Sequence, residues 1–147
     1  MSDNKTPQIL LDNKNNYPNE PALSVKQNNE WVTMNWSEYY DFVIKISKSL
    51  IACGLEPGDK GSIYSYNRKE WFGCYSALQM VNSASVGVYH TSSAPEVEWV
   101  VGNSDSKLVF VGNNPNDNGE KEKMPIHRLM SVVNNLEKVA HIVLLGD

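Results

Sequence analysis

Three short signals for helix starts constrain the fold of this chain more than any other sequence feature. Each has a capping residue followed three positions later by a glutamate: Asn35 and Glu38, Asn67 and Glu70, and Ser93 and Glu96. The cap side chain accepts a hydrogen bond from a free N–H of the first helical turn, and the glutamate reaches back to the N–H of the cap. We therefore expect a helix to begin at each of the three sites, with these six residues as structural helix caps.

Apolar stretches rich in strand-forming residues alternate with helical periodicity along the chain. Strands are predicted over 61–66, 85–89, 107–111 and 141–145, and helices over 40–51, 71–81, 97–101 and 126–135. This alternation is typical of parallel β-α-β units. The sequence therefore predicts an α/β fold in which alternating strand–helix units form a mostly parallel sheet flanked by helices.

The first part of the chain differs from the rest. Residues 1–20 are polar apart from one short apolar stretch, which predicts an N-terminal arm or a short helix. Residues 21–147 carry the strand–helix pattern, preceded by two short strands at 22–25 and 31–34 around a polar turn. A length of 147 residues corresponds to about one domain.

Charge and composition exclude several functional classes. The net charge of -4 lacks the basic surplus of a nucleic-acid-binding protein. No apolar run approaches the ~18 residues of a transmembrane helix, and the polar start is unlike a secretory signal. Cys53 and Cys74 both lie in helical patterns, which predicts reduced thiols rather than a disulfide framework. These features favour a cytoplasmic protein.

The sequence contains no convincing motif for catalysis or for metal binding. The stretch that starts at Asn114 is similar to the first positions of a calcium loop, but its twelfth residue is Pro125 instead of glutamate. No nucleophile elbow is present. No ligating partner stands at metal-site spacing from any of the histidines, which are His90, His127 and His141. We therefore predict no catalytic and no metal-binding residue in this chain.

The polar segment 91–93 follows a predicted strand, which is where α/β sheets bind ligands. It lacks the glycines and the lysine that would hold a triphosphate, so helix capping is its expected role. The same holds for Asn67, which could touch a ligand but is expected to cap a helix. No cofactor-binding residue is predicted.

Six motifs in order resemble one family of enzymes. They are Pro21-Ala22-Leu23, the segment 31–39 from Trp31 to Tyr39, the segment 54–59 from Gly54 to Asp59, Asn67-Arg68-Lys69-Glu70-Trp71, the segment 86–93 and the segment 104–111. From about Leu11 onward, the chain resembles the N-terminal part of the AMP-forming acyl-CoA synthetases, most closely the long-chain fatty-acid type. One departure is Asn82, where the family often has glycine.

The resemblance implies an α/β portion, residues 21–147, of a larger adenylating domain and a ligase reaction in two steps. A fatty carboxylate attacks the α-phosphate of ATP, and coenzyme A then takes the acyl group from the adenylate. The family's phosphate loop Thr-Ser-Gly-Thr-Thr-Gly and its Tyr-Gly-x-Thr-Glu and Thr-Gly-Asp motifs are absent from these residues. The isolated chain is therefore expected to be inactive and to bind no cofactor. ATP, Mg²⁺ and CoA would act in the full-length enzyme, which could also lie at a membrane surface.

Two alternatives remain open from the sequence. The first is a freestanding, non-catalytic module derived from a truncated ligase, which would bind the missing remainder or itself through an exposed sheet edge. The second is an independent flavodoxin-like nucleotide binder, which the lack of a phosphate-binding loop disfavours.

Overall fold

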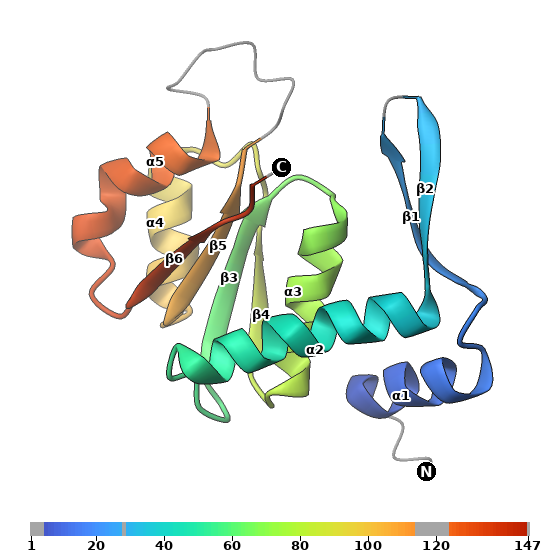
Figure 1. The fold of residues 1–147 in the computed structure, drawn as a ribbon. Coiled ribbons are helices and arrows are strands. Elements are labelled where there is room, and N and C mark those ends of the chain that lie inside the picture. The colour runs from blue at the N-terminus through green and yellow to red at the C-terminus, as the bar shows by residue number, and fades with distance from the viewer. Residues whose placement is uncertain (1–4, 28, 114–123, 147) are drawn as a thin grey trace.

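The computed structural model describes residues 5–27, 29–113 and 124–146 (Figure 1). The elements follow the alternation expected from the sequence. In chain order they are α1 (Thr6–Asn16), β1 (Pro21–Gln27), β2 (Glu30–Asn35), α2 (Trp36–Ala52), β3 (Lys60–Ser65), α3 (Lys69–Met80), β4 (Ala84–Val88), α4 (Ala94–Asn103), β5 (Leu108–Gly112), α5 (Pro125–Val132), the 3-10 helix η2 (Val133–Asn135) and β6 (His141–Leu144).

Four strands form one parallel sheet in the order β4-β3-β5-β6. Ile63 at the centre of β3 lies opposite Gly87 of β4 and Phe110 of β5. The two early strands pair with each other instead, as the antiparallel hairpin β1–β2, which rises beside α3 in Figure 1. The predicted α/β fold with a mostly parallel sheet is therefore confirmed.

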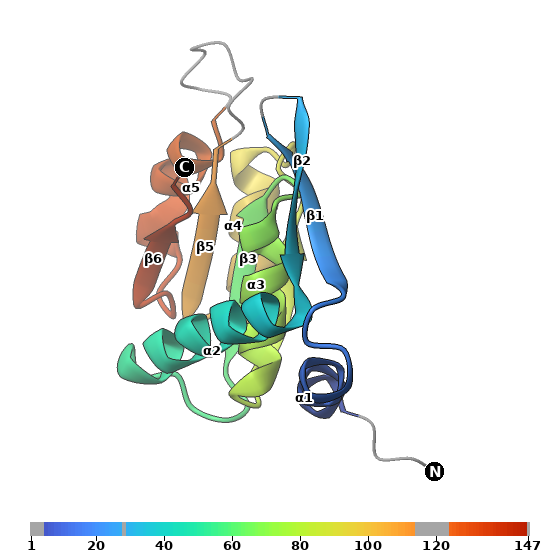
Figure 2. The same cartoon turned by 45° about the vertical axis from the view of Figure 1, so that its right-hand side comes forward.

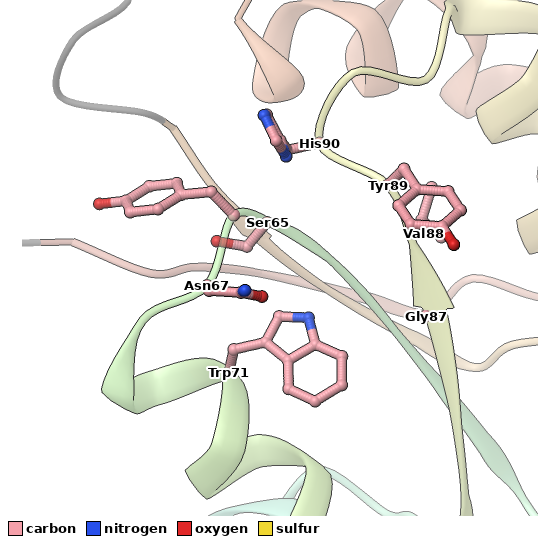
Figure 3. Close-up of a pocket in the computed structure, with 8 residues that line it drawn as sticks. Ser65, Asn67, Trp71, Gly87, Val88, Tyr89 and His90 are labelled. Carbon is pink, nitrogen blue, oxygen red and sulfur yellow. The ribbon is translucent and has the colours of Figure 1, made fainter. Parts of the chain in front are cut away.

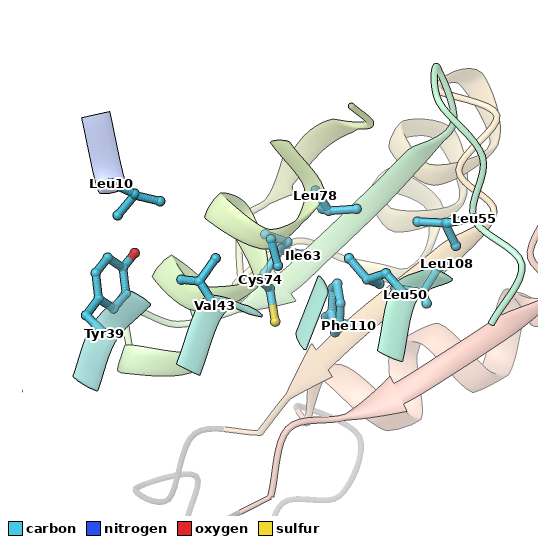
Figure 4. Packing of buried hydrophobic residues seen from close by; sticks show 11 residues of the cluster. Leu10, Tyr39, Val43, Leu50, Leu55, Ile63, Cys74, Leu78, Leu108 and Phe110 are labelled. Atoms are coloured by element: carbon cyan, nitrogen blue, oxygen red, sulfur yellow. The ribbon is translucent and has the colours of Figure 1, made fainter. Parts of the chain in front are cut away.

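The sheet separates two hydrophobic clusters because successive side chains of a strand point to opposite faces. Ile63 and Phe110 pack with α2 and α3 on one face, where Figure 4 shows Val43, Leu50 and Leu78 gathered around them. Side chains of the alternate strand positions pack with α4 and α5 on the other face; they include Tyr64, Val109 and Val111. The turned view in Figure 2 shows the helices in front of and behind the sheet.

Helix α2 begins at the capping box expected from the sequence. The Asn35 side chain accepts a hydrogen bond from the Glu38 N–H (2.8 Å), and the Glu38 carboxylate accepts one from the Asn35 N–H (2.9 Å). At the other end Gly54 follows the helix with φ 79°, a left-handed conformation that glycine adopts without strain. Sequence signals thus account for both ends of this helix.

Replacing the cap tests this part of the fold. We expect Asn35→Ala to lower the free energy of unfolding by about 1 kcal/mol, because a first-turn N–H loses its acceptor. Urea denaturation followed by circular dichroism measures the change. Asn67→Ala is the matched control, since the structure gives Asn67 no capping role, and its effect should stay within about 0.5 kcal/mol. Equal losses in the two variants would contradict the assignment.

The expected cap at Asn67 is wrong by one residue. Helix α3 has Arg68 at its N-cap position, in an extended conformation (φ -152°, ψ 165°) and without a side-chain cap. Glu70 is thus the second helical residue and cannot reach back in the manner of a capping box. Its carboxylate accepts a hydrogen bond from Nε of Arg68 at 2.7 Å instead. Glu70, which the sequence spacing predicts as part of a capping box, therefore forms an ion pair with Arg68.

At the start of α4, the Glu96 carboxylate accepts hydrogen bonds from the Ser93 N–H (2.7 Å) and from the Ser93 hydroxyl (2.8 Å). These bonds, the backbone one first, lower the pKa of Glu96 below its usual 4.5. A carboxyl whose pKa is lowered by folding stabilises the protein above its unfolded pKa, and this contribution is lost as the pH falls through the folded pKa. The glutamate predicted from the sequence does reach back to its cap.

The pH dependence of Glu96→Gln follows from this shift. We expect the variant to be less stable than the parent at about pH 7, and the difference to shrink as the pH is lowered to about 3. Urea titrations at several pH values measure it. A difference that stays constant with pH would show that the Glu96 charge plays no part in holding the helix start.

The two cysteines differ in exposure. Cys74 is 1% exposed in the α2–α3 cluster, and burial raises the pKa of its thiol to about 12. Cys53, after the end of α2, is half-buried, and both are free thiols. Because the thiolate is the reactive form, Cys74 should resist alkylation in the folded chain while Cys53 is modified.

Alkylation with iodoacetamide at about pH 8, followed by peptide mass spectrometry, checks this expectation. Native chain should carry the label at Cys53 and gain it at Cys74 after denaturant is added. Rapid labelling of Cys74 without denaturant would contradict the packing of α3 against the sheet.

The turn before β4 contains Asn82, where the acyl-CoA synthetases that the sequence resembles often have glycine. Asn82 has φ 58°, a left-handed conformation that asparagine tolerates better than most residues. Its carbonyl also accepts a hydrogen bond from the Gly58 N–H at 2.8 Å. Asparagine therefore keeps the tight helix-to-strand turn that a glycine would allow.

Candidate functional site

A pocket of about 470 Å³ lies at the carboxyl ends of β3 and β4. This edge of a parallel sheet is where α/β proteins bind ligands. Figure 3 shows Ser65, Asn67 and Trp71 on one side and Val88, Tyr89 and His90 facing them. The complete lining is Ser65, Tyr66, Asn67, Trp71, Gly87, Val88, Tyr89 and His90.

Ser65, the last residue of β3, gives the pocket its most unusual feature. Its side chain is buried (4% exposed), and its Oγ has no hydrogen-bond partner among the residues that the structure describes. Gly112 lies against it on β5: a Cβ there would overlap Ser65 Oγ and approach Leu145 Cβ to 3.4 Å. A buried hydroxyl without a hydrogen-bond partner costs free energy, so Ser65 is a polar group that the described residues leave unsatisfied.

Trp71 of α3 forms the apolar wall of the pocket, and two other aromatic side chains of α3 pack against it. The Trp71 ring stacks on the Tyr75 ring at 5.8 Å with an interplanar angle of 12°, and meets Phe72 edge-on at 5.5 Å. Across the pocket, a Cβ at Gly87 would lie 3.9 Å from Trp71 Cζ2. The indole is therefore held in place by its neighbours and faces backbone rather than a bulky side chain.

The loop after β4 forms the opposite wall of the pocket, and side chains of β3 and α5 hold it by hydrogen bonds. The buried Tyr64 hydroxyl donates to the Ser92 carbonyl at 2.9 Å, and Arg128 of α5 donates to the same oxygen at 3.1 Å. Burial raises the pKa of Tyr64, and the nearby Arg128 opposes this rise only in part. Tyr64 thus stays a neutral hydrogen-bond donor to the loop.

The chemistry of this lining suits binding rather than nucleophilic catalysis. It offers a hydroxyl, an amide and an imidazole beside a flat aromatic face, and no carboxylate or ammonium group lines it. Among the described residues, no base hydrogen-bonds to the Ser65 Oγ, which a nucleophilic serine would need. The arrangement fits a slender ligand with neutral polar groups.

Most of the residues singled out in the sequence lie outside the pocket beside Ser65. Asn67 lies in the pocket, whereas Asn35 and Glu38 start α2 far from it in the chain and Glu70 pairs with Arg68. Segment 91–93 contributes Thr91 and Ser93 to a second pocket of about 430 Å³, together with Ala94, His127, Arg128 and Ser131. The calcium-like residues at 114–123 lie outside the described residues.

The described part of the chain has neither a metal-ligating cluster nor a membrane-spanning helix. Within residues 5–27, 29–113 and 124–146, no three His, Cys, Asp or Glu side chains come together in a way that could hold a metal ion. None of the helices in these ranges has the length and apolar character needed to span a membrane.

Sequence reasoning missed Ser65 and both arginines. Ser65 ends an apolar strand, and its position at the carboxyl edge was the available signal. Arg68 and Arg128 are the only 2 arginines in a sequence with 11 lysines, which is the one sequence signal that distinguishes them.

Comparison with known proteins decides the family. The family model described as AMP-binding enzyme matches residues 10–147, nearly the whole chain. The chain belongs to the AMP-binding enzyme family. The resemblance seen in the sequence motifs is confirmed.

Two relatives of this chain are long-chain acyl-CoA ligases. The human long-chain-fatty-acid–CoA ligase ACSBG2 is 30% identical over 107 residues, which are 73% of this chain and 16% of the relative. Long chain acyl-CoA synthetase 5 from Arabidopsis thaliana is 30% identical over 114 residues, 74% of this chain and 16% of that protein. The chain thus spans about a sixth of the length of these relatives.

Solved structures share the fold of this chain. The N-terminal domain of FACL13 from Mycobacterium tuberculosis superimposes with a TM-score of 0.80 at 17% identity, covering 97% of this chain and 34% of that one. The anthranilate CoA ligase AuaEII, in complex with anthranoyl-AMP, gives 0.79 at 18% identity, with 97% and 25% coverage. At such identities the likeness concerns the fold.

Proposed function

We propose that this chain supplies an N-terminal α/β portion of a long-chain fatty-acid–CoA ligase and is inactive by itself. The observation that carries the proposal is the match of residues 10–147 to the AMP-binding family, joined to 30% identity with long-chain ligases. In such a ligase, ATP activates a fatty carboxylate as the acyl-adenylate with release of pyrophosphate. The thiol of coenzyme A then displaces AMP. We expect the enzyme in the cytoplasm.

The residues of this chain support the reaction without performing it. Its parallel sheet would form one wall of the adenylating domain, and the pocket beside Ser65 and Trp71 would contact a neutral part of a substrate. The described residues hold no metal-ligating cluster and the sequence has no phosphate loop, so we assign ATP and Mg²⁺ contacts to other parts of the enzyme. The domain division into 1–20 and 21–147 remains part of this proposal.

Sequencing the transcript beyond the codon for Asp147 tests the proposal. We expect an open reading frame that encodes a Thr-Ser-Gly-Thr-Thr-Gly phosphate loop, and a full product that forms acyl-CoA from a long-chain fatty acid, ATP and CoA. A stop codon directly after Asp147 in every transcript would overturn the proposal. So would a full-length product that adenylates no fatty acid.

A second candidate is a self-associating module, favoured by the uncovered edges of the sheet. Strand β4 is an edge strand whose five residues, Ala84–Val88, include neither a charge nor a proline to block pairing. The other edge, β6, exposes Leu144 (59%). Sedimentation equilibrium separates the candidates: a monomer at all concentrations contradicts self-association, and a concentration-dependent dimer supports it.

A further inference from the structure

Both arginines of the chain bind backbone carbonyls at the carboxyl edge of the sheet. Arg68 donates from its two terminal nitrogens to the carbonyls of Leu145 (3.2 Å) and Gly146 (2.9 Å), just after β6. Arg128 donates to the Ser92 carbonyl (3.1 Å) and, more weakly, to the His90 carbonyl (3.4 Å), just after β4.

The geometry at Arg68 requires a guanidinium. Its side chain is 8% exposed, and its Nε donates to the Glu70 carboxylate (2.7 Å) while the terminal nitrogens reach two successive carbonyls. A planar fork with five N–H donors can satisfy three acceptors in fixed directions, whereas a lysine ammonium is a single point. Arg68 thereby ties the turn after β3 to the segment after β6, across the end of β5.

Arg128 ties the loop after β4 in a similar way. Its guanidinium shares the Ser92 carbonyl with the Tyr64 hydroxyl, so donors from α5 and from β3 converge on one oxygen. This loop includes Tyr89 and His90, which line the pocket beside Ser65. Arg128 itself does not line that pocket.

We propose that Arg68 and Arg128 are positioning residues that hold the two walls of the Ser65 pocket in place before any ligand binds. Arg68 fixes the wall that carries Tyr66 and Asn67, and Arg128 fixes the wall that carries Tyr89 and His90. Neither arginine lines the pocket. Arg128 acts through the backbone that it holds, and Arg68 acts through backbone and through the Tyr66 ring, whose centroid lies 5.5 Å from its Cζ. The proposal concerns the free protein and holds whether or not the chain is part of a ligase.

Amide hydrogen exchange by NMR in the full chain tests the proposal, because each clamped loop contains a hydrogen-bonded reporter. The Ser92 N–H donates to the Tyr89 carbonyl (2.9 Å), and the Leu145 N–H donates to the Val111 carbonyl (2.8 Å). We expect Arg128→Ala to speed exchange at Ser92 about tenfold or more and to leave Leu145 unchanged. Arg68→Ala should do the reverse, so each variant serves as the control for the other.

Conservative variants and chemical rescue separate positioning from general stability. Arg128→Lys and Arg68→Lys keep the charge but should still lose protection at their own loop. Added methylguanidinium should restore protection in the alanine variants, and methylammonium should not. A uniform rise of exchange across β5 and both loops would overturn the proposal, as would full protection in the lysine variants. Tyr64→Phe should give a smaller rise at Ser92, since Arg128 still holds that carbonyl.

Discussion

Leu78→Ala should lower the free energy of unfolding by about 2–5 kcal/mol, the range for a fully buried leucine. Leu78 is 0% exposed and lies between α3 and the sheet. It packs directly on the backbone of β3, since a Cβ added at Gly61 would stand 2.7 Å from Leu78 Cδ2. A strand cannot move inward to fill the space that the leucine leaves. Denaturant unfolding measures the loss.

Two further variants test whether the loss in Leu78→Ala comes from the packing of Leu78 on β3. Leu144→Ala is the control, because Leu144 is 59% exposed and its loss should change stability by less than about 1 kcal/mol. Gly61→Ala should cost about 1–3 kcal/mol alone, from overpacking against Leu78. In the Leu78→Ala background it should cost less, because the added methyl enters the vacated space. Additive losses in this cycle would contradict the direct packing of Leu78 on Gly61.

Gly73→Ala should destabilise the chain by about 1–3 kcal/mol, although alanine favours helices more than glycine does. Gly73 lies inside α3 and faces Phe42 and Ile46 of α2. A Cβ at Gly73 would overlap the Phe42 ring and reach 3.0 Å from Ile46 Cδ1. The helices must separate or Phe42 must leave its position, and both choices weaken the α2–α3 contact. Thermal unfolding of parent and variant measures the effect.

Gly102→Ala provides the matched control inside another helix. At Gly102, in α4, the nearest atom to an added Cβ is Leu136 Cδ2 at 3.7 Å, an ordinary contact. With no clash, the helix propensity of alanine should raise stability by about 0.5–1 kcal/mol. The two glycine variants are therefore expected to change stability in opposite directions, and a gain in both would refute the close helix approach at Gly73.

Periodicity and caps made most of the fold predictable, because these signals are local. The α2 capping box depends only on Asn35 and Glu38, and strand–helix alternation leaves few choices besides a parallel sheet. The start of α3 was missed by one residue for a non-local reason. The Arg68 guanidinium donates to the carbonyls of Leu145 and Gly146, 77 and 78 positions later in the chain. It also donates to the Glu70 carboxylate, which therefore does not cap the helix.

The candidate site was far less predictable than the fold. Ser65 looks like any polar residue at a strand end, and its importance comes from burial against Gly112 of another strand. Arg128 can hydrogen-bond to the loop after β4 only because the folded chain places α5 next to that loop. Such properties arise from tertiary packing, which brings together residues whose separation in the sequence carries no signal. Family motifs identified the class of enzyme but named none of these side chains.

Fatty-acid-dependent exchange of pyrophosphate into ATP tests the central claim most directly, because it measures adenylation without requiring CoA. The chain of 147 residues should give the same rate with and without a long-chain fatty acid, while an intact long-chain ligase assayed in parallel should show strong dependence. That result is predicted for a scaffold portion that lacks the phosphate loop. Exchange by the chain that rises with fatty acid and saturates would contradict the account.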